Sequence, residues 1–413
     1  MRIVSGRRAD AMVERLAGRG SDFSRLEPRV RRIIEGVRRG GDRSLRRYAE
    51  RWDGLAAKQP LRVSDEEMAA ALRTIPPVLR KSLRQAAQNI RRFCEWQKPK
   101  SWTRTRDGIS VGQIVRPLES VGCYVPGGRY PLVSTLLMTV IPAQVAGVRN
   151  VRVVSPRPSA EVLAGGAMLG VREFYRVGGA QAVAALAYGS DSIPRVDKIM
   201  GPGNAYVTVA KKLVSFDCAI DFLAGPTEAV ALSDSGNPEF IAADLVAQAE
   251  HDPDTLVLFI TTSRELALSV KLSATRLAKG NRIAEESLRV RGAILVAASR
   301  AEAREWANHI APEHITVEAD DLPFIQNAGS IFVGDYSAQA AGDYASGPNH
   351  VLPTSGQARF RGGLSVLDFV KIITVQRLSA KGLRGIAPAV ECLANAEGLP
   401  AHSQSIRVRW EHA

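Results

Sequence analysis

The feature that most constrains the fold is an alternation of β-rich and helical runs that starts near residue 112. Runs such as SVGCYV, NVRVVS and TLVLFITT are separated by helical patterns such as STLLMTVIPAQVAGV and AQAVAALAYG. Strands that alternate with helices in this way are typical of doubly wound, largely parallel sheets. Because the units are too many for one small sheet, the sequence predicts two α/β domains.

The expected architecture is two doubly wound, incomplete Rossmann-like domains with a helical N-terminal segment and a small helical C-terminal extension. Residues 1–120 would comprise the helical segment and the first part of the first α/β domain. Residues 121–226 would form the second domain, and residues 227–365 would complete the first. The extension, residues 366–413, has a helical pattern that ends in SIRVRW, which is typical of a short basic strand.

The net charge of +13 is concentrated near the N-terminus, where residues 1–51 hold fifteen arginines and seven acidic residues. A basic region of this kind is compatible with nucleic-acid binding, which is the alternative from another functional class. However, apolar residues recur there at helical spacing: Val30, Ile33, Ile34 and Val37. Amphipathic helices with solvated basic faces explain this pattern, and aromatic residues spaced for base stacking are missing. We therefore expect no nucleic-acid partner.

Cellular location and redox chemistry follow from what the chain contains. No apolar run is as long as a membrane span, and acidic residues among the N-terminal arginines argue against a transit peptide. The four cysteines, Cys94, Cys123, Cys218 and Cys392, form no CxxC pair. This spacing argues against a disulfide framework and against a cysteine zinc site. We expect a cytoplasmic protein with buried or incidental thiols and no membrane partner.

Four glycine-rich loops follow predicted strands: YVPGG (124–128), GGAQ (178–181), GPGN (201–204) and AGPTE (224–228). In doubly wound folds ligands bind at the carboxyl ends of the strands. Each loop alone is more typical of a turn, but four of them on consecutive strand ends favour a ligand cleft. The fingerprint GxGxxG is absent in its usual context, so a nucleotide would bind by another arrangement.

The segment NPEFIAADLVAQAEH predicts a helix with Asn237 as its N-cap. Ile241 and Leu245 mark the apolar stripe, and Gln248 continues it. Gln248 and His251 are three residues apart, so we expect both on one face of the helix. A polar pair on an apolar stripe needs partners, which a metal ion or a buried hydrogen-bond network could provide. The hydrogen-bond network is the commoner of the two.

The segment IAPEHITV places Glu313 and His314 side by side where a predicted helix ends and a predicted strand begins. Such a pair could be a solvated corner. It could also provide two bases of different basicity to one substrate. The glycine-rich segment GDYASGPNHVLPT adds Asp343, Asn349 and His350 as further polar candidates.

The segment AIDFLAGPTEAVALSD, followed by IAADLVAQAEHD, resembles the signature region of the histidinol dehydrogenase family. Further segments resemble the same family and appear in its order: CYVPGGRYPLVSTLLMTVIPAQVAGV, GGAQAVAALAYG, KIMGPGNAYV, IAPEHITV, GDYASGPNHVLPT and AEGLPAHSQSIRVR. These segments extend over roughly three quarters of the chain. Their combination is specific, whereas the helical N-terminal part carries no sharp motif.

In that family one zinc ion is bound by the glutamine and histidine of QxEH, the aspartate of GDYASG and the histidine of EGLxAH. The resemblance therefore implies a zinc site with these ligands: Gln248, His251, Asp343 and His402. Nitrogen and oxygen ligands without thiolates suit zinc. Substrate nitrogens would complete the coordination, so that zinc orients the substrate as a template.

Other roles are implied in the same way. The pair of PEH, here Glu313 and His314, would provide the acid–base groups. The positions that contact NAD in the family correspond to Tyr124, Gln181 and Asn204. Besides the zinc ligands and His314, the positions around the substrate correspond to Thr227, Glu397 and His350, of which His350 has the weakest match.

The implied reaction is the oxidation of L-histidinol to L-histidine in two NAD-dependent steps through an aldehyde, the last steps of histidine biosynthesis. His314 would accept the alcohol proton, and Glu313 would activate water to hydrate the aldehyde. A thiohemiacetal on Cys123 is the rival chemistry, but nothing in the sequence nearby would lower the pKa of that thiol.

Members of the family are homodimers in which the C-terminal segment crosses to the active site of the partner. The resemblance thus implies that Glu397 and His402 act in the other subunit. The closest alternative is a relative of the same fold that oxidises another small primary alcohol with NAD. The intact set of zinc ligands and the EGLxAH tail favour histidinol over such an alcohol.

Overall fold

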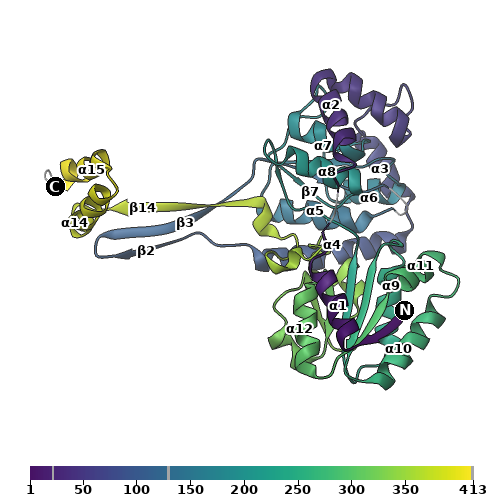
Figure 1. The fold of residues 1–413 in the computed structure, drawn as a ribbon. Coiled ribbons are helices and arrows are strands. Elements are labelled where there is room, and N and C mark those ends of the chain that lie inside the picture. Colours follow the sequence, from purple (N-terminus) through teal and green to yellow (C-terminus); the bar gives the residue numbers. More distant parts are fainter. Residues whose placement is uncertain (21–22, 128–130, 411–413) are drawn as a thin grey trace.

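The computed structural model describes residues 1–20, 23–127 and 131–410. It contains two parallel sheets, each flanked by helices, and an antiparallel sheet that forms a projecting arm (Figure 1). The predicted α/β class with two largely parallel sheets is confirmed. Within the described residues, no helix is long and apolar enough to span a membrane.

The larger sheet is six-stranded and entirely parallel. Its strands, in spatial order, are β1 (Arg2–Ser5), β11 (Ala293–Val296), β10 (Leu256–Thr261), β9 (Glu228–Leu232), β12 (His314–Val317) and β13 (Ser330–Val333). Since successive strand residues point to opposite faces, the sheet buries two apolar layers. The helices of one layer are α1 (Arg7–Ala17) and α12 (Arg300–Ile310). Those of the other are α9 (Pro238–Ala249), α10 (Arg264–Leu277) and α11 (Arg282–Val290).

The smaller parallel sheet has five strands. In spatial order they are β6 (Glu173–Tyr175), β5 (Asn150–Val154), β4 (Ser120–Tyr124), β7 (Lys198–Met200) and β8 (Ala219–Ile220). One face packs on α3 (Asp65–Thr74), α4 (Pro77–Gln97), α5 (Val133–Ala146) and α6 (Ala160–Met168). The other face packs on α2 (Glu27–Tyr48), α7 (Gly179–Tyr188) and α8 (Ala205–Val214).

The N-terminal region is helical except at its start. The expected amphipathic helix is present, because α2 buries the apolar stripe from Val30 to Val37 and leaves most of its arginines exposed. The start of the chain differs from the expectation, since β1 is an edge strand paired with β11. A strand of four residues followed directly by an amphipathic helix carries too little periodicity to be recognised from sequence.

The arm is an antiparallel sheet in the order β14 (Val370–Leu378), β3 (Ile109–Pro117) and β2 (Trp102–Arg106). It carries α14 (Ala380–Ala396) and α15 (Pro400–Trp410) at its tip, away from both parallel sheets (Figure 1). The helical extension expected from about residue 367 is present as α14 and α15, but it is preceded by a strand that was not predicted, because β14 pairs with β3 along nine residues. The segment SIRVRW lies in α15 rather than in a strand, since this helix packs against α14.

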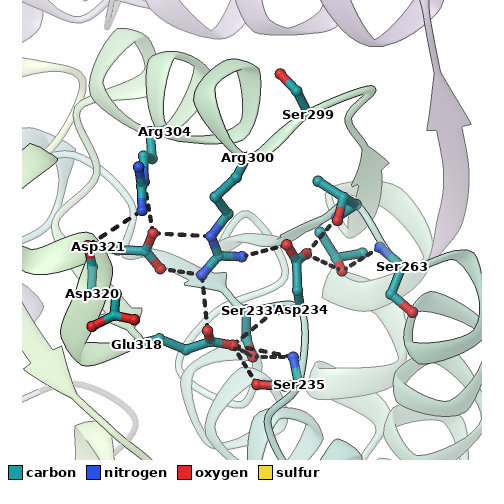
Figure 2. Close-up of polar contacts among 12 residues, drawn as sticks. Ser233, Asp234, Ser235, Ser263, Ser299, Arg300, Arg304, Glu318, Asp320 and Asp321 are labelled. Atoms are coloured by element: carbon teal, nitrogen blue, oxygen red, sulfur yellow. Dashed lines mark hydrogen bonds and ion pairs between the residues drawn. The ribbon is translucent and has the colours of Figure 1, made fainter.

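The carboxyl edge of the larger sheet is filled by ion pairs (Figure 2). Arg300, at the start of α12, lies 3.1 Å from Asp234 after β9 and 3.3 Å from Glu318 after β12, and it also pairs with the buried Asp321. Arg304 reinforces Asp321 through a contact of 2.8 Å. Parallel sheets usually bind ligands at this edge. In this sheet, charged side chains that pair with one another occupy that edge.

Short helical segments complete the described chain: η1 (Ala49–Asp53), η2 (Ala319–Phe324), α13 (Gln339–Tyr344), η3 (Gln357–Arg359) and η4 (Val366–Phe369). The segment between β8 and β9 connects the two parallel sheets. It leads from the carboxyl end of β8 to the amino end of β9, where β12 also begins. The loop 224–228 therefore connects the ligand-binding edge of one sheet with the amino edge of the other.

Candidate active site

The junction between α12 and β12 positions Glu313 and His314. The helix ends at Ile310, Ala311 adopts a left-handed conformation with φ of 49°, and the strand begins at His314. This is the predicted change from helix to strand. The side chains of Glu313 and His314 are only 9% and 4% exposed. Burial of both groups excludes the reading as a solvated corner.

The imidazole of His314 lies between two carboxyl groups. Its Nδ1 is 3.8 Å from Oε2 of Glu313, and its Nε2 is 3.3 Å from Oδ1 of Asp343. The same Oε2 of Glu313 accepts a hydrogen bond of 3.0 Å from the backbone N–H of Glu228. Three titratable groups from two elements, the β12 junction and α13, thus meet at one buried point.

Burial raises the pKa of Glu313 to about 8, although the adjacent His314 acts in the opposite direction. For His314 burial acts to lower the pKa, but the charges of Glu313 and Asp343 outweigh it and the pKa is raised. Burial likewise opposes ionisation of Asp343, yet the contact with His314 keeps its pKa below the usual value. Glu313 and His314 therefore hold their protons to a higher pH than usual, whereas Asp343 stays ionised to a lower pH than usual.

Gln248 and Asp343 lie in direct contact. Gln248 is buried near the end of α9, and its Nε2 donates a hydrogen bond of 2.9 Å to Oδ2 of Asp343. Its Oε1 is also buried and has no hydrogen-bond partner among the described residues. A buried amide oxygen without a donor is costly unless another group, such as a cation, binds it.

His251 was predicted to lie on the same helix face as Gln248, and the structure does not place it there. The helix α9 begins with Asn237 as its N-cap, as expected, but ends at Ala249. His251 follows the helix, and its side chain is exposed. Over the part of the chain that the structure describes, no cluster of three or more His, Cys, Asp or Glu residues is suited to hold a metal.

His402 and Glu397 lie far from this point. Glu397 is the C-cap of α14 and His402 lies in α15, both at the tip of the arm, and both side chains are exposed (Figure 1). The structure therefore does not bring these two predicted residues to Glu313 within one chain.

Thr227 and His350 flank the buried groups. Thr227 immediately precedes Glu228, and its carbonyl accepts a hydrogen bond of 2.9 Å from the N–H of Leu256. Nδ1 of His350 is 2.6 Å from the carbonyl oxygen of Asp343, and burial lowers the pKa of this histidine. Asn349 instead donates 2.7 Å to the carbonyl of Met138, which is a structural contact.

A pocket of about 370 Å³ lies at the carboxyl edge of the smaller sheet. It brings together the three predicted cofactor residues Tyr124, Gln181 and Asn204. Its other lining residues are Arg29, Ile33, Trp52, Asp53, Pro126, Gly127, Pro156, Arg157, Gly179, Ala180 and Tyr206. Gly128, the last residue of the predicted loop 124–128, lies outside the described residues.

Hydrogen bonds fix the polar groups of this pocket. The hydroxyl of Tyr124 accepts 2.9 Å from the N–H of Gly179, and the carboxyl of Asp53 accepts 3.0 Å from Nε2 of Gln181. The side chain of Asn204 caps α8. Gly201 is required where its chain passes Tyr124, since φ is 105° and a Cβ would lie 2.3 Å from the Tyr124 carbonyl oxygen.

Sequence reasoning missed Arg29, Trp52, Asp53 and Arg157 in this pocket. The first three lie in the N-terminal helical region, which was interpreted as solvated faces. Arg157 follows a strand and has a left-handed φ of 47°, a feature that the sequence does not reveal. The contact that brings α2 onto α7 and α8 is long-range and leaves no pattern in the sequence.

Cys123, the candidate for the rival chemistry, is fully buried in β4. Burial raises the pKa of its thiol to about 12, so the reactive thiolate is disfavoured. The structure thus gives no support to a covalent step on this residue.

A pocket at the carboxyl edge of a parallel sheet is where α/β enzymes bind ligands such as dinucleotides, and a buried carboxyl–imidazole pair is suited to acid–base catalysis. A family model described as histidinol dehydrogenase matches residues 17–410. The chain belongs to the histidinol dehydrogenase family and is an oxidoreductase.

Similar proteins agree with this assignment. Histidinol dehydrogenase of Methanothermobacter thermautotrophicus is 48% identical over 393 residues, which cover 91% of this chain and 92% of that protein. Histidinol dehydrogenase of Aquifex aeolicus is 43% identical and covers 99% of both. A crystal structure of histidinol dehydrogenase from Elizabethkingia anophelis has a TM-score of 0.94 at 34% identity, covering 100% of this chain and 98% of that one.

Proposed function

We propose that this protein oxidises L-histidinol to L-histidine in two NAD-dependent steps through the aldehyde, as the last steps of histidine biosynthesis in the cytoplasm. The observation that carries the proposal is the buried His314 between Glu313 and Asp343, in a chain of the histidinol dehydrogenase family. A base with a second titratable group beside it is what two successive oxidations of one carbon require.

In the first oxidation, His314 accepts the proton of the substrate hydroxyl while hydride leaves the carbon for the nicotinamide. The neighbouring carboxyl groups, at 3.8 and 3.3 Å, stabilise the resulting imidazolium. The products of this step are the aldehyde, NADH and the proton on His314.

Before the second oxidation, Glu313 removes a proton from water as the water oxygen bonds to the aldehyde carbon. The carbonyl oxygen takes the proton that His314 holds, which gives the hydrate and leaves His314 free to act as a base again. The hydrate loses a second hydride to another NAD, and His314 accepts its hydroxyl proton, which yields the carboxylic acid. The pKa of about 8 suits Glu313 to this task, because a base works best with a pKa near the working pH.

We propose that two adjacent residues provide part of a zinc site. Buried Oε1 of Gln248 has no donor among the described residues, and the adjacent Asp343 provides a carboxylate. His251 of the same chain and His402 of a partner would complete the proposed ligand set. When bound, zinc would orient the nitrogens of the substrate as a Lewis acid and template.

We further propose a homodimer in which the arm of one subunit completes the site of the other. The arm is a three-stranded sheet in which every residue of β2 and all but the first of β14 are exposed. It exposes large apolar side chains on its strands: Trp102, Val111, Ile372, Ile373, Val375 and Leu378. Such a sheet is marginally stable alone and favours burial against a second chain. His402 and Glu397 at its tip are exposed and have no role within their own protomer's site.

The pocket at residues Tyr124, Gln181 and Asn204 is the proposed NAD site. The amino ends of α7 and α8 meet there, and Arg29 and Arg157 add positive charge. Helix amino ends and arginines both favour the pyrophosphate of a dinucleotide. In this proposal residues 121–226 form the cofactor domain, while residues 1–120 and 227–365 supply the other domain and residues 366–413 the exchanged segment.

The test is product identification with a substrate panel. The purified protein is incubated with NAD and histidinol or other small primary alcohols, and the products are identified by mass spectrometry. Histidine formed from histidinol, with slower turnover of the other alcohols, supports the proposal. Preference for another alcohol would favour the alternative relative of the same fold. Salt-sensitive nucleic-acid binding without NADH formation would favour the basic-protein alternative.

A further inference from the structure

Arg19 forms hydrogen bonds through its whole guanidinium group, most of them to residues near the acid–base pair. A guanidinium has five N–H donors, and all of them have acceptors here. Nε and Nη2 each donate 2.6 Å to the carboxylate of Glu228. The other donors contact three backbone carbonyls: Leu16 at 2.5 Å, Ile310 at 2.7 Å and Ala311 at 3.4 Å. The Arg19 side chain is 16% exposed and that of Glu228 only 4%.

Glu228 connects this arginine to Glu313. The first residues of β9 and β12 are paired so that His314 lies opposite Ala229, which places Glu228 beside Glu313. The N–H of Glu228 donates 3.0 Å to Oε2 of Glu313, while its own carboxylate also accepts 2.9 Å from the N–H of Ser355. The charge of Glu228 acts to raise the pKa of Glu313, and a cation paired with Glu228 offsets this repulsion between two buried carboxyl groups.

Arg19 also holds the turn that carries the pair. Ala311 has a left-handed φ of 49°, a strained conformation for a residue other than glycine. The hydrogen bonds of Arg19 to the carbonyls of Ile310 and Ala311 fix this turn two residues before Glu313. One side chain therefore controls both the backbone before the catalytic pair and the charge beside it.

We propose that Arg19 is a positioning residue of the reaction, acting through Glu228 and the turn at Ala311 to hold Glu313 and His314. This inference rests on the proposed function of that pair. It extends the active site to the N-terminal segment that follows α1, to which Arg19 belongs.

The experiment compares Arg19→Ala and Arg19→Lys with the wild type and with Arg359→Ala. Arg359 is a matched control because it joins the same two segments, donating 3.0 Å to the carbonyl of Ala17 and also to that of His309. Among the described residues, the hydrogen bonds of Arg359 are to backbone carbonyls and not to a carboxyl group of the site. For each variant, kcat, the KM for NAD, the zinc content and the thermal midpoint are measured with histidinol as substrate.

We expect Arg19→Ala to lower kcat by about tenfold to a hundredfold, since displacement of a catalytic group by about 1 Å has effects of up to this size. The KM for NAD should stay within about twofold, because the cofactor pocket lies on the other sheet. Arg19→Lys keeps the positive charge but lacks the forked donors of a guanidinium group. Its kcat should therefore lie between those of the wild type and Arg19→Ala. Arg359→Ala should lower the thermal midpoint and leave kcat near the wild-type value.

Several outcomes would overturn the inference. If the wild type oxidises histidinol and Arg19→Ala keeps its kcat, Arg19 does not position the pair. If Arg359→Ala loses as much kcat as Arg19→Ala, the effect comes from weaker packing between the two segments and not from the contacts of Arg19 with the site. If Arg19→Ala does not fold, Arg19→Lys decides by the same criterion. If the wild type itself forms no NADH from histidinol, the proposed function fails and not this inference alone.

Discussion

Nε2 of His314 lies 3.3 Å from Oδ1 of Asp343, so the proposed proton acceptor and a proposed zinc ligand are in direct contact. Asp343 also accepts a hydrogen bond from Gln248 through its other oxygen. One carboxylate thus links the acid–base pair to the end of α9. A change at Asp343 should therefore affect both metal binding and proton transfer.

Replacement of Asp343 by Asn should lower the zinc content of the purified protein and reduce kcat by about a hundredfold. The amide keeps the shape but removes the negative charge that a cation and the imidazolium require. Zinc is quantified by atomic emission, and Asp252→Asn, an exposed neighbour of His251, is the matched control. Full zinc content with unchanged kcat in Asp343→Asn would contradict the assignment.

Replacement of Glu313 by Gln should block the second oxidation more than the first. Hydration of the aldehyde needs a base, and its loss should slow histidine formation by about a hundredfold to a thousandfold. With an aldehyde trap present, the variant should still release close to one NADH per histidinol. If it oxidises the aldehyde at the wild-type rate, Glu313 is not the base for water.

Subunits with different defects should complement each other if the arm is exchanged. Inactive His402→Ala and Glu313→Ala proteins, mixed after reversible dissociation, should recover up to about a quarter of the wild-type activity. The control mixes Glu313→Ala with His314→Ala, whose defects lie in the same half of the site, and should recover none. Equal recovery of activity in both mixtures, or no recovery in the first mixture, would contradict the shared-site proposal.

The ion pairs in Figure 2 predict a pH-dependent stability. Burial acts to raise the pKa of Asp234 and of Glu318, but their hydrogen bonds and Arg300 outweigh it and hold both pKa values below the usual 3.8 and 4.5. Carboxyl groups with lowered pKa stabilise the folded state above their unfolded values. This stabilisation is lost as the pH falls through the lowered values.

Accordingly, Arg300→Gln should reduce the free energy of unfolding by about 3 kcal/mol at pH 7, because buried Asp321 loses a partner. The difference from wild type should shrink below about pH 4. Urea unfolding at several pH values measures it. Arg276→Gln, which breaks an exposed pair with Glu239, should change stability by less than about 0.5 kcal/mol. A constant difference down to pH 2 would refute the coupling.

The parallel sheets and the helix-to-strand junction at Glu313 were predictable because their signals are local. Buried strands form continuous apolar runs, and α9 begins with its capping asparagine as expected. The clustering of Tyr124, Gln181 and Asn204 was implied by a family resemblance rather than by periodicity, and the structure brings these residues to one pocket.

Other features depend on contacts that a sequence does not display. The strand β14 exposes most of its residues, so it lacks the alternation of a half-buried strand. The helical pattern of the sequence continues to His251, but α9 ends at Ala249, so His251 lies beyond the helix. The hydrogen bonds of Arg19 to Glu228 join residues 209 positions apart. Nothing in the local sequence distinguishes Arg19 from the other arginines among the fifteen near the N-terminus.

The stoichiometry of NADH formation tests the central claim most directly. A limiting amount of histidinol is added with excess NAD, and absorbance of NADH is followed to completion, with and without prior treatment with a metal chelator. The account predicts about two NADH per histidinol, loss of turnover after metal removal, and recovery on addition of zinc. A single NADH per histidinol, or full activity in demonstrably metal-free protein, would contradict it.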